Sequence, residues 1–136
     1  MNLVDTSAWI EYFFGGPNAR YFTPPIEDTP ELVVPVICIY EVFKKVNIVA
    51  DQAKAVRAIA QMKQGMIVDL TEDVALSAAL ISIRHKLPMA DSLIYATSRA
   101  REAVLWTQDE HFGDLPDVKY KKARTKASSV RRESRR

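Results

Sequence analysis

Short apolar runs alternate along this chain with longer segments in which apolar residues recur at helical spacing. The short runs predict strands at residues 2–4, 32–34, 66–68 and 104–106, with a fifth at 118–120. The longer segments predict helices over 8–14, 36–46, 51–64, 74–85 and 89–101. Short strands separated by helices of about ten or more residues pair in parallel through right-handed crossovers. We therefore predict a three-layer α/β/α sandwich around a mainly parallel sheet of four to five strands.

Aromatic residues are concentrated in the first predicted helix and just after it. They recur at helical spacing, which is typical of side chains that pack in a core. We expect this cluster to form core and dimer surface rather than a platform for stacked bases, which would need exposed rings beside a basic groove. Its members are Trp9, Tyr12, Phe13, Phe14, Tyr21 and Phe22.

The length of 136 residues and the 48% hydrophobic content predict one ordinary domain, which at this size folds without disulfides or a structural metal. Cys38 is the only cysteine, so a disulfide framework and a cysteine-ligated zinc site are both excluded. No apolar stretch approaches the roughly 18 residues that span a bilayer, and the first residues lack the basic region of a signal peptide. We expect a protein of the reducing cytoplasm that makes no contact with a membrane.

Charge is distributed unevenly, although the net charge is only +2. From Val118 onward the chain carries nine Lys and Arg and one acid, whereas the preceding residues carry ten bases and sixteen acids. An acidic body with a basic end indicates a polyanionic partner, most simply a nucleic acid, although a solvated tail without a function explains the same run. We divide the chain into a folded domain over 1–120 and a basic C-terminal tail over 121–136.

Acidic residues stand where the carboxyl ends of the predicted parallel strands meet. Asp5 follows the first strand directly, and Glu41 lies in the second turn of the helix after the second strand. Asp91 lies in the first turn of the helix after Pro88, and Asp109 comes just past the fourth strand. Working sites of open parallel sheets lie at this edge. We therefore expect these four carboxylates to converge.

Four carboxylates in one pocket repel one another, because two unit charges about 4 Å apart interact by about 4 kcal/mol at an effective dielectric near 20. Hard divalent cations offset that repulsion, and Mg²⁺ and Mn²⁺ both accept carboxylate oxygens. A pair of such ions about 3.5–4 Å apart also holds the attacking and leaving oxygens of a phosphodiester. The pattern therefore favours a cofactor of Mg²⁺ or Mn²⁺ and the hydrolysis of phosphodiester bonds.

Each acid also has a purely structural explanation. Asp5 is placed to cap the first helix, with Ser7 as the competing cap. Glu41 is placed to pair with Lys44 or Lys45 at helical spacing.

The other two acids have similar alternatives. Asp91 is placed to interact only with the dipole of its helix, and three acids close to Asp109 are equally able to act in its place. These neighbours are Glu110, Asp114 and Asp117. The histidines His85 and His111 lack ligand spacing to one another, and we expect both on the surface or in loops.

Four sequence blocks resemble the PIN domain family, in order and at family spacing, and in particular its VapC-type toxin ribonucleases from bacterial and archaeal toxin–antitoxin pairs. The blocks are LVDTSAW at 3–9, IYEV at 39–42, PMADSLIYAT at 88–97 and LWTQDEHF at 105–112. Together they cover roughly residues 1–120. One block alone is weak evidence, whereas four in order are specific.

This resemblance implies a PIN-like α/β fold and an endoribonuclease that depends on Mg²⁺ or Mn²⁺. By block, the catalytic and metal-ligating acids are Asp5, Glu41, Asp91 and Asp109. The resemblance further implies polar helpers at the metal or phosphate, namely Thr6 or Ser7 and Thr107. It implies an RNA substrate, a homodimer, and a cognate antitoxin that inserts into the active site.

The basic end gives a further set of expected RNA contacts, because lysines and arginines that bind phosphates offset the negative charge of the body. The members that we assign to substrate binding are Lys119, Lys121, Lys122 and Arg124. The chain departs from the family in two places. Residues 35–37 lack the serine or threonine that many relatives have there, and the basic extension after Tyr120 is longer than usual.

Two other functions fit the same fold. One is a nuclease that processes RNA or cuts DNA rather than a toxin. The other is a module that binds RNA or a protein partner without catalysis, which has less need for mutually repelling carboxylates. The sequence contains no Walker loop, no glycine-rich dinucleotide fingerprint and no nucleophile elbow, which disfavours P-loop nucleotide hydrolysis, hydride transfer and serine hydrolysis.

Overall fold

The computed structural model describes residues 1–124, so most of the predicted basic tail lies outside the described residues. Five strands and six helices alternate, with two short 3₁₀ turns. The strands are β1 (Asn2–Val4), β2 (Leu32–Pro35), β3 (Met66–Val68), β4 (Val104–Thr107) and β5 (Val118–Tyr120). The helices are α1 (Thr6–Phe13), α2 (Ala19–Glu27), α3 (Val36–Val49), α4 (Gln52–Met62), α5 (Glu72–His85) and α6 (Met89–Ala100). The 3₁₀ turns are η1 (Thr29–Glu31) and η2 (Glu110–Phe112).

The strands form a single sheet in the order β3-β2-β1-β4-β5, and every neighbouring pair is parallel. The predicted parallel α/β sheet is therefore confirmed, with all five strands present. β1 is central: Leu3 aligns with Val33 of β2 on one side and with Leu105 of β4 on the other. The carboxyl ends of strands that are far apart in sequence thus lie next to each other.

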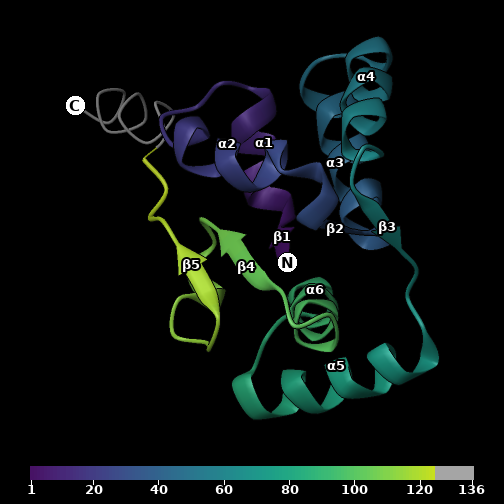
Figure 1. Ribbon diagram of the computed structural model, residues 1–136, viewed down its shortest axis with the longest axis vertical. Helices are drawn as coiled ribbons and strands as arrows, with labels where there is room; N and C mark the ends of the chain where they lie inside the picture. The colour runs from purple at the N-terminus through teal and green to yellow at the C-terminus, as the bar shows by residue number, and fades with distance from the viewer. Residues whose placement is uncertain (125–136) are drawn as a thin grey trace.

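Helices cover both faces of this sheet, as Figure 1 shows. α6 contacts β2 and β4, and α5 lies along the outer side of α6. On the opposite face α2 contacts β1, and α1 packs between α2 and α3. Right-handed crossovers between parallel strands produce this three-layer arrangement, which leaves the carboxyl edge of the sheet open between α1, α3 and α6.

The starts of α1, α4 and α5 are set by side chains that accept backbone N–H groups. Asp5 accepts the N–H of Ala8 at 3.0 Å, and Asp51 accepts the N–H of Lys54 at 2.7 Å. Such N-caps satisfy donors that have no partner within the helix. The predicted helices therefore begin within two residues of their expected starts, and α3 extends three residues beyond its expected end at Val46.

Helix α2 is not predicted by the sequence pattern, because it contains Pro24 and Pro25. Proline removes a backbone donor and is unfavourable inside a helix. The two prolines stand near the carboxyl end of this short helix, and Phe22 and Ile26 on the same helix are buried in the core. Burial of these large apolar side chains outweighs the lost hydrogen bonds.

The aromatic cluster predicted for the core is largely there. Trp9 and Phe22 are fully buried, and the Trp9 ring stacks on that of Phe13 with centroids 5.4 Å apart. Tyr12 meets the same indole edge-on at 6.4 Å. The predicted core is confirmed for Trp9 and Phe22, with Tyr12, Phe13 and Tyr21 partly buried against it, whereas Phe14 is 37% exposed and is not part of the core. The part of these rings in a dimer surface stays a prediction.

Gly65 makes the turn into β3 against the backbone of β2, and a side chain at this position has no room. An added Cβ would lie 2.9 Å from the carbonyl oxygen of Leu32 and 2.9 Å from a methyl group of Val34. Replacing Gly65 with alanine is therefore expected to lower the free energy of unfolding by about 1–3 kcal/mol, because β2 and β3 must separate. Urea denaturation measures the change, and the neighbouring Gln64→Ala provides the control, with a change near zero.

None of the helices within residues 1–124 combines the length and the apolar character that a bilayer crossing requires.

Candidate active site

Asp5 lies at the carboxyl end of β1, the central strand, and is only 3% exposed. One carboxylate oxygen accepts the hydroxyl of Ser7 at 2.8 Å and the N–H of Ala8 at 3.0 Å. The other accepts the hydroxyl of Thr107 at 2.7 Å. Burial raises the pKa of Asp5 to about 7, against the opposing effect of these three hydrogen bonds. Asp5 therefore both caps α1 and places a carboxylate at the carboxyl edge of the sheet.

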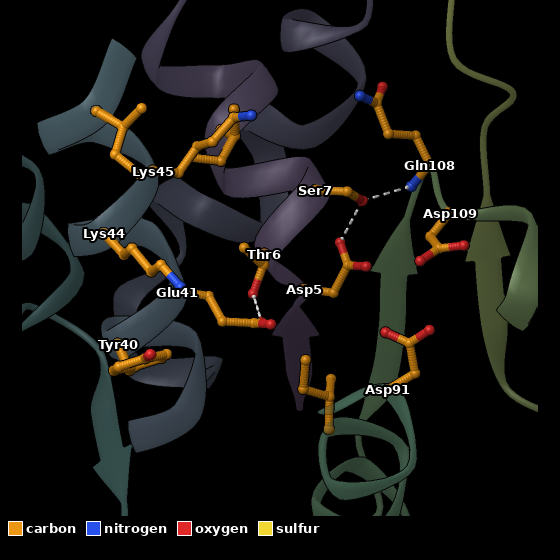
Figure 2. Close-up of a pocket in the computed structure, with 13 residues that line it drawn as sticks. Asp5, Thr6, Ser7, Tyr40, Glu41, Lys44, Lys45, Asp91, Gln108 and Asp109 are labelled. Atoms are coloured by element: carbon orange, nitrogen blue, oxygen red, sulfur yellow. Dashed lines mark hydrogen bonds between the residues drawn. The ribbon is translucent and has the colours of Figure 1, made fainter. Parts of the chain in front are cut away.

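Glu41 projects from α3 toward Asp5, as Figure 2 shows. One of its carboxylate oxygens accepts the hydroxyl of Thr6 at 2.5 Å. Within residues 1–124 it forms no ion pair with Lys44 or Lys45, the partners that the structural alternative required. The Glu41 carboxylate is therefore held at the cavity by a neutral hydroxyl and not by a lysine of the described residues.

Asp91 and Asp109 approach the same space from α6 and from the end of β4. The imidazole of His111 joins them: its Nδ1 atom lies 2.9 Å from a carboxylate oxygen of Asp91 and 3.3 Å from one of Asp109. Partial burial raises the pKa of Asp91, and the hydrogen bond to Asp91 is the main reason why the pKa of His111 is also raised. The pKa values of both Asp91 and His111 are therefore raised, and such shifts are common in functional sites.

The carboxylates of Asp5, Glu41, Asp91 and Asp109 line one cavity of about 530 Å³ (Figure 2). The cavity is open to solvent, and its apolar and basic wall on α3, which also carries Glu41, lies opposite Asp91 and Asp109. The remaining lining residues are Thr6, Ser7, Ile10, Tyr40, Lys44, Lys45, Ile48, Ile94 and Gln108. The four acids selected from the sequence therefore do share a pocket, at the edge of the sheet where they were expected.

The three predicted polar helpers contact the acids themselves. Thr6 donates to Glu41, while Ser7 and Thr107 donate to Asp5. Thr107 also accepts the N–H of Asp109 at 2.9 Å, so its hydroxyl links two of the acids. These hydroxyls fix the orientation of the carboxylates.

The basic residues assigned to substrate binding lie outside the cavity. The Lys119 ammonium lies 4.6 Å from the centroid of the Trp106 ring, and that of Lys121 lies 5.6 Å from the centroid of Tyr21. Both lysines therefore occupy the β4–β5 side next to α2 rather than the acid pocket. Lys122 accepts a hydrogen bond from Asn18 through its backbone carbonyl, and its side chain is exposed, as is that of Arg124.

Two features of the pocket go beyond the sequence assignment. His111 is a partly exposed residue of the turn η2, as expected, but it also contacts two of the acids. Its place two residues after Asp109 was the available signal. Tyr40 and Lys44 line the pocket as well, and their positions beside Glu41 at helical spacing were the signal for them.

The donor set fits a divalent metal ion. Asp91, Asp109 and His111 each offer one ligand atom, and these atoms lie within 4.8 Å of one another. Carboxylate oxygens suit Mg²⁺ and Mn²⁺, and an imidazole nitrogen is accepted by Mn²⁺ more readily than by Mg²⁺. Burial raises the pKa of Asp5 and of Asp91, and a cation bound beside them would favour their ionised forms.

Comparisons with known proteins agree on the architecture. The PIN domain model matches residues 3–118, whereas no curated protein sequence matched the chain. A toxin–antitoxin complex from Klebsiella pneumoniae superposes with a TM-score of 0.76 at 21% identity, covering 90% of this chain and 100% of that one.

Two further solved structures are similar in fold. VapC20 from Mycobacterium tuberculosis, described as a toxin that cleaves the sarcin–ricin loop, gives a TM-score of 0.74 at 18% identity, over 87% of this chain and 97% of that one. The DNA-bound VapBC complex from Salmonella typhimurium gives 0.69 at 13% identity, over 90% of this chain and 98% of that one. At these identities the likeness is one of fold.

Proposed function

The chain belongs to the PIN domain family, and on that basis we propose that it is a metal-dependent endoribonuclease, the toxin of a VapBC-type toxin–antitoxin pair. The observation that carries the proposal is the convergence of Asp5, Glu41, Asp91 and Asp109 in one open cavity. A binding module gains nothing from four neighbouring carboxylates, which repel one another and the RNA backbone alike. A hydrolase that uses cations to hold a phosphodiester requires them.

We assign the metal to these four acids, with His111 as an additional ligand beside Asp91 and Asp109. A bound Mg²⁺ or Mn²⁺ supplies Lewis acidity, which polarises a phosphoryl oxygen and lowers the pKa of a water molecule. The protein residues supply the orientation. Thr107 and Ser7 hold both oxygens of Asp5, and Thr6 holds Glu41, so that the carboxylates need little rearrangement when charge builds up on the phosphate.

The basic end of the chain has a separate part in this proposal. Lys119, Lys121, Lys122 and Arg124 are exposed and lie away from the acid pocket. They bind RNA phosphates remote from the cleaved bond and so offset the negative charge of the body. The corresponding division of the chain is a nuclease domain over 1–120 followed by a basic tail over 121–136.

The partners that we propose are RNA, a cognate antitoxin and a second copy of the chain. Support for the antitoxin comes from the similar folds found in toxin–antitoxin complexes. Support for a homodimer comes from α5, where Leu76, Leu80 and Ile83 are all more than half exposed at helical spacing. Exposed apolar stripes of this kind mark interaction surfaces. The site of action that we propose is the cytoplasm, where Cys38 stays reduced.

The test is cleavage of total cellular RNA by the purified protein, with the cut sites mapped by sequencing of the new ends. We expect discrete cuts in the presence of Mg²⁺ or Mn²⁺ and none after chelation. Asp91→Asn is expected to lower the cleavage rate at least about 100-fold. The matched control is Asp114→Asn, which removes an exposed acid outside the cavity and leaves the rate unchanged.

Other outcomes identify the alternatives. RNA binding without metal-dependent turnover would make the protein a binding module. If Asp91→Asn cleaved RNA at the wild-type rate, the acid cluster would have no part in catalysis. Cuts confined to the maturation sites of precursor RNA would favour an RNA-processing nuclease over a toxin.

A further inference from the structure

One wall of the acid pocket is formed by the exposed face of α3 on either side of Glu41. Tyr40, Lys44 and Ile48 follow one another at four-residue intervals, so they lie along one face of this helix. All three line the cavity, and Lys45 joins them. In Figure 2 the Tyr40 and Lys44 side chains lie on α3, across the pocket from Asp91 and Asp109. The pocket therefore has Asp91 and Asp109 on one side and, on the other, a basic and aromatic wall that also carries Glu41.

The two lysines of this wall have no acidic partner. Within residues 1–124, no carboxylate oxygen lies within 4.0 Å of the ammonium of Lys44 or Lys45. Glu41, on the same helix, accepts the Thr6 hydroxyl instead. The Lys44 ammonium lies 5.8 Å from the centroid of the Tyr40 ring. Both cations are therefore available to a negatively charged ligand that enters the cavity.

Tyr40 is a large aromatic side chain left 62% exposed at the rim of this cavity. Its ring makes no aromatic contact within the described residues, unlike Trp9, Tyr12, Phe13 and Tyr21. Packing of the protein interior therefore does not account for its position. Aromatic rings interleaved with lysines beside a reaction site are the features by which proteins bind unpaired nucleotides, since every base offers a flat face for stacking.

We propose that Tyr40 stacks on an unpaired base next to the scissile phosphodiester, and that Lys44 and Lys45 bind the adjoining phosphates. This inference rests on the proposed function and adds to it the residues that hold the nucleotides beside the cleaved bond. A base inside an A-form duplex is stacked between its neighbours, and the deep, narrow major groove does not admit a protein side chain. A duplex therefore cannot engage Tyr40, whereas a strand with splayed bases can.

The experiment measures binding, so that it does not depend on cleavage. The inactive Asp91→Asn protein is titrated in Mg²⁺ into a short fluorescein-labelled oligoribonucleotide of mixed sequence without secondary structure, and fluorescence anisotropy gives the Kd. The same strand annealed to its complement is the duplex probe. We expect Tyr40→Ala in this background to weaken binding of the single strand about five- to hundredfold. The Kd for the duplex is expected to change little.

Conservative variants separate stacking and charge from a merely structural effect. Tyr40→Phe keeps the ring and is expected to bind like the parent protein, whereas Tyr40→Leu is expected to behave like Tyr40→Ala. Lys44→Gln is expected to reduce the slope of log K against log salt concentration by about 0.7, the value for one phosphate on a single strand. Lys44→Arg restores that slope. The charge-matched control Lys63→Gln, on the exposed end of α4, leaves it unchanged.

Two results would overturn the inference: single-strand affinity that is unaffected by Tyr40→Ala, or equal losses for the single strand and the duplex. Failure of the proposed function has a different signature. If the wild-type protein binds the single strand through Tyr40 but never cleaves it with Mg²⁺ or Mn²⁺, the nuclease assignment fails while the α3 wall remains an RNA-binding surface.

Discussion

Replacing Asp5 with asparagine is expected to lower metal-dependent RNA cleavage at least about 100-fold and, at the same time, to stabilise the metal-free protein. The loss of activity follows because the neutral amide no longer offers a negative oxygen to a cation at the centre of the pocket. Asparagine keeps the shape of the side chain and one oxygen for Ser7 and Ala8. The fold is therefore expected to be unchanged.

The gain in stability follows from the pKa of the Asp5 carboxyl, which burial raises from its ordinary value of 3.8 to about 7. A raised folded-state pKa means that the folded protein holds the proton more tightly than the unfolded chain. The associated stability is present below about pH 4 and is lost as the pH rises through 7. The metal-free wild-type protein therefore pays for ionised Asp5 at neutral pH, and the asparagine variant does not.

The expected gain at pH 8 is on the order of 2 kcal/mol. This is less than the roughly 4 kcal/mol that a shift of this size represents, because the amide N–H faces the Thr107 hydroxyl, which loses its acceptor. Urea denaturation in chelator at pH 4.5 and pH 8 measures the difference between the variant and the wild type. If the variant and the wild type differed in stability by the same amount at pH 4.5 and at pH 8, the role of the buried charge would be contradicted. Undiminished cleavage would contradict the site itself.

Truncating Trp9 to alanine is expected to lower the free energy of unfolding by about 3–5 kcal/mol, a large part of the stability of a domain of this size. Trp9 is fully buried, and it is the side chain on which Tyr12 and Phe13 pack. Trp9 lies on α1, the helix that follows Asp5, so its loss leaves a cavity on the buried side of this helix. Thermal and urea denaturation measure the effect.

The control for this substitution is Trp9→Phe. The indole N–H is buried without a hydrogen-bond partner within the described residues, which is costly in an apolar interior. Phenylalanine keeps an aromatic ring and removes that unsatisfied donor, so its cost is expected to stay within about 1.5 kcal/mol. A cost as large as that of Trp9→Ala would mean that the indole makes a specific contact instead of filling space.

Much of the fold follows from periodicity, because each strand of the parallel sheet is a short apolar run and each helix has its own apolar face. The clear failure is α2, where Pro24 and Pro25 argue against a helix locally. Burial of Phe22 and Ile26 decides in favour of the helix. That information is tertiary and is absent from local sequence.

In the candidate site, too, some features follow from the sequence and others only from tertiary packing. The positions of the four acids follow from topology alone, since each stands at or shortly after the carboxyl end of a strand or in the helix that follows. The hydrogen bonds that these acids make with other side chains do not follow from topology. Helical spacing places Lys44 within reach of Glu41, but only the packing of α1 against α3 shows that Glu41 is held by Thr6 instead. In the same way, only the folded turn η2 brings the imidazole of His111 to Asp91.

The central position of β1 between β2 and β4 also bears on synthesis of the protein. Asn2 pairs with Val104, and the Asp5 carboxylate is fixed by a hydroxyl 102 residues later in the chain, that of Thr107. A growing polypeptide on the ribosome cannot complete this pairing until β4 has left the exit tunnel, and contacts of such long range form late. The four acids of the pocket therefore come together only after β4 has been synthesised, and a chain that terminates before β4 lacks the assembled pocket.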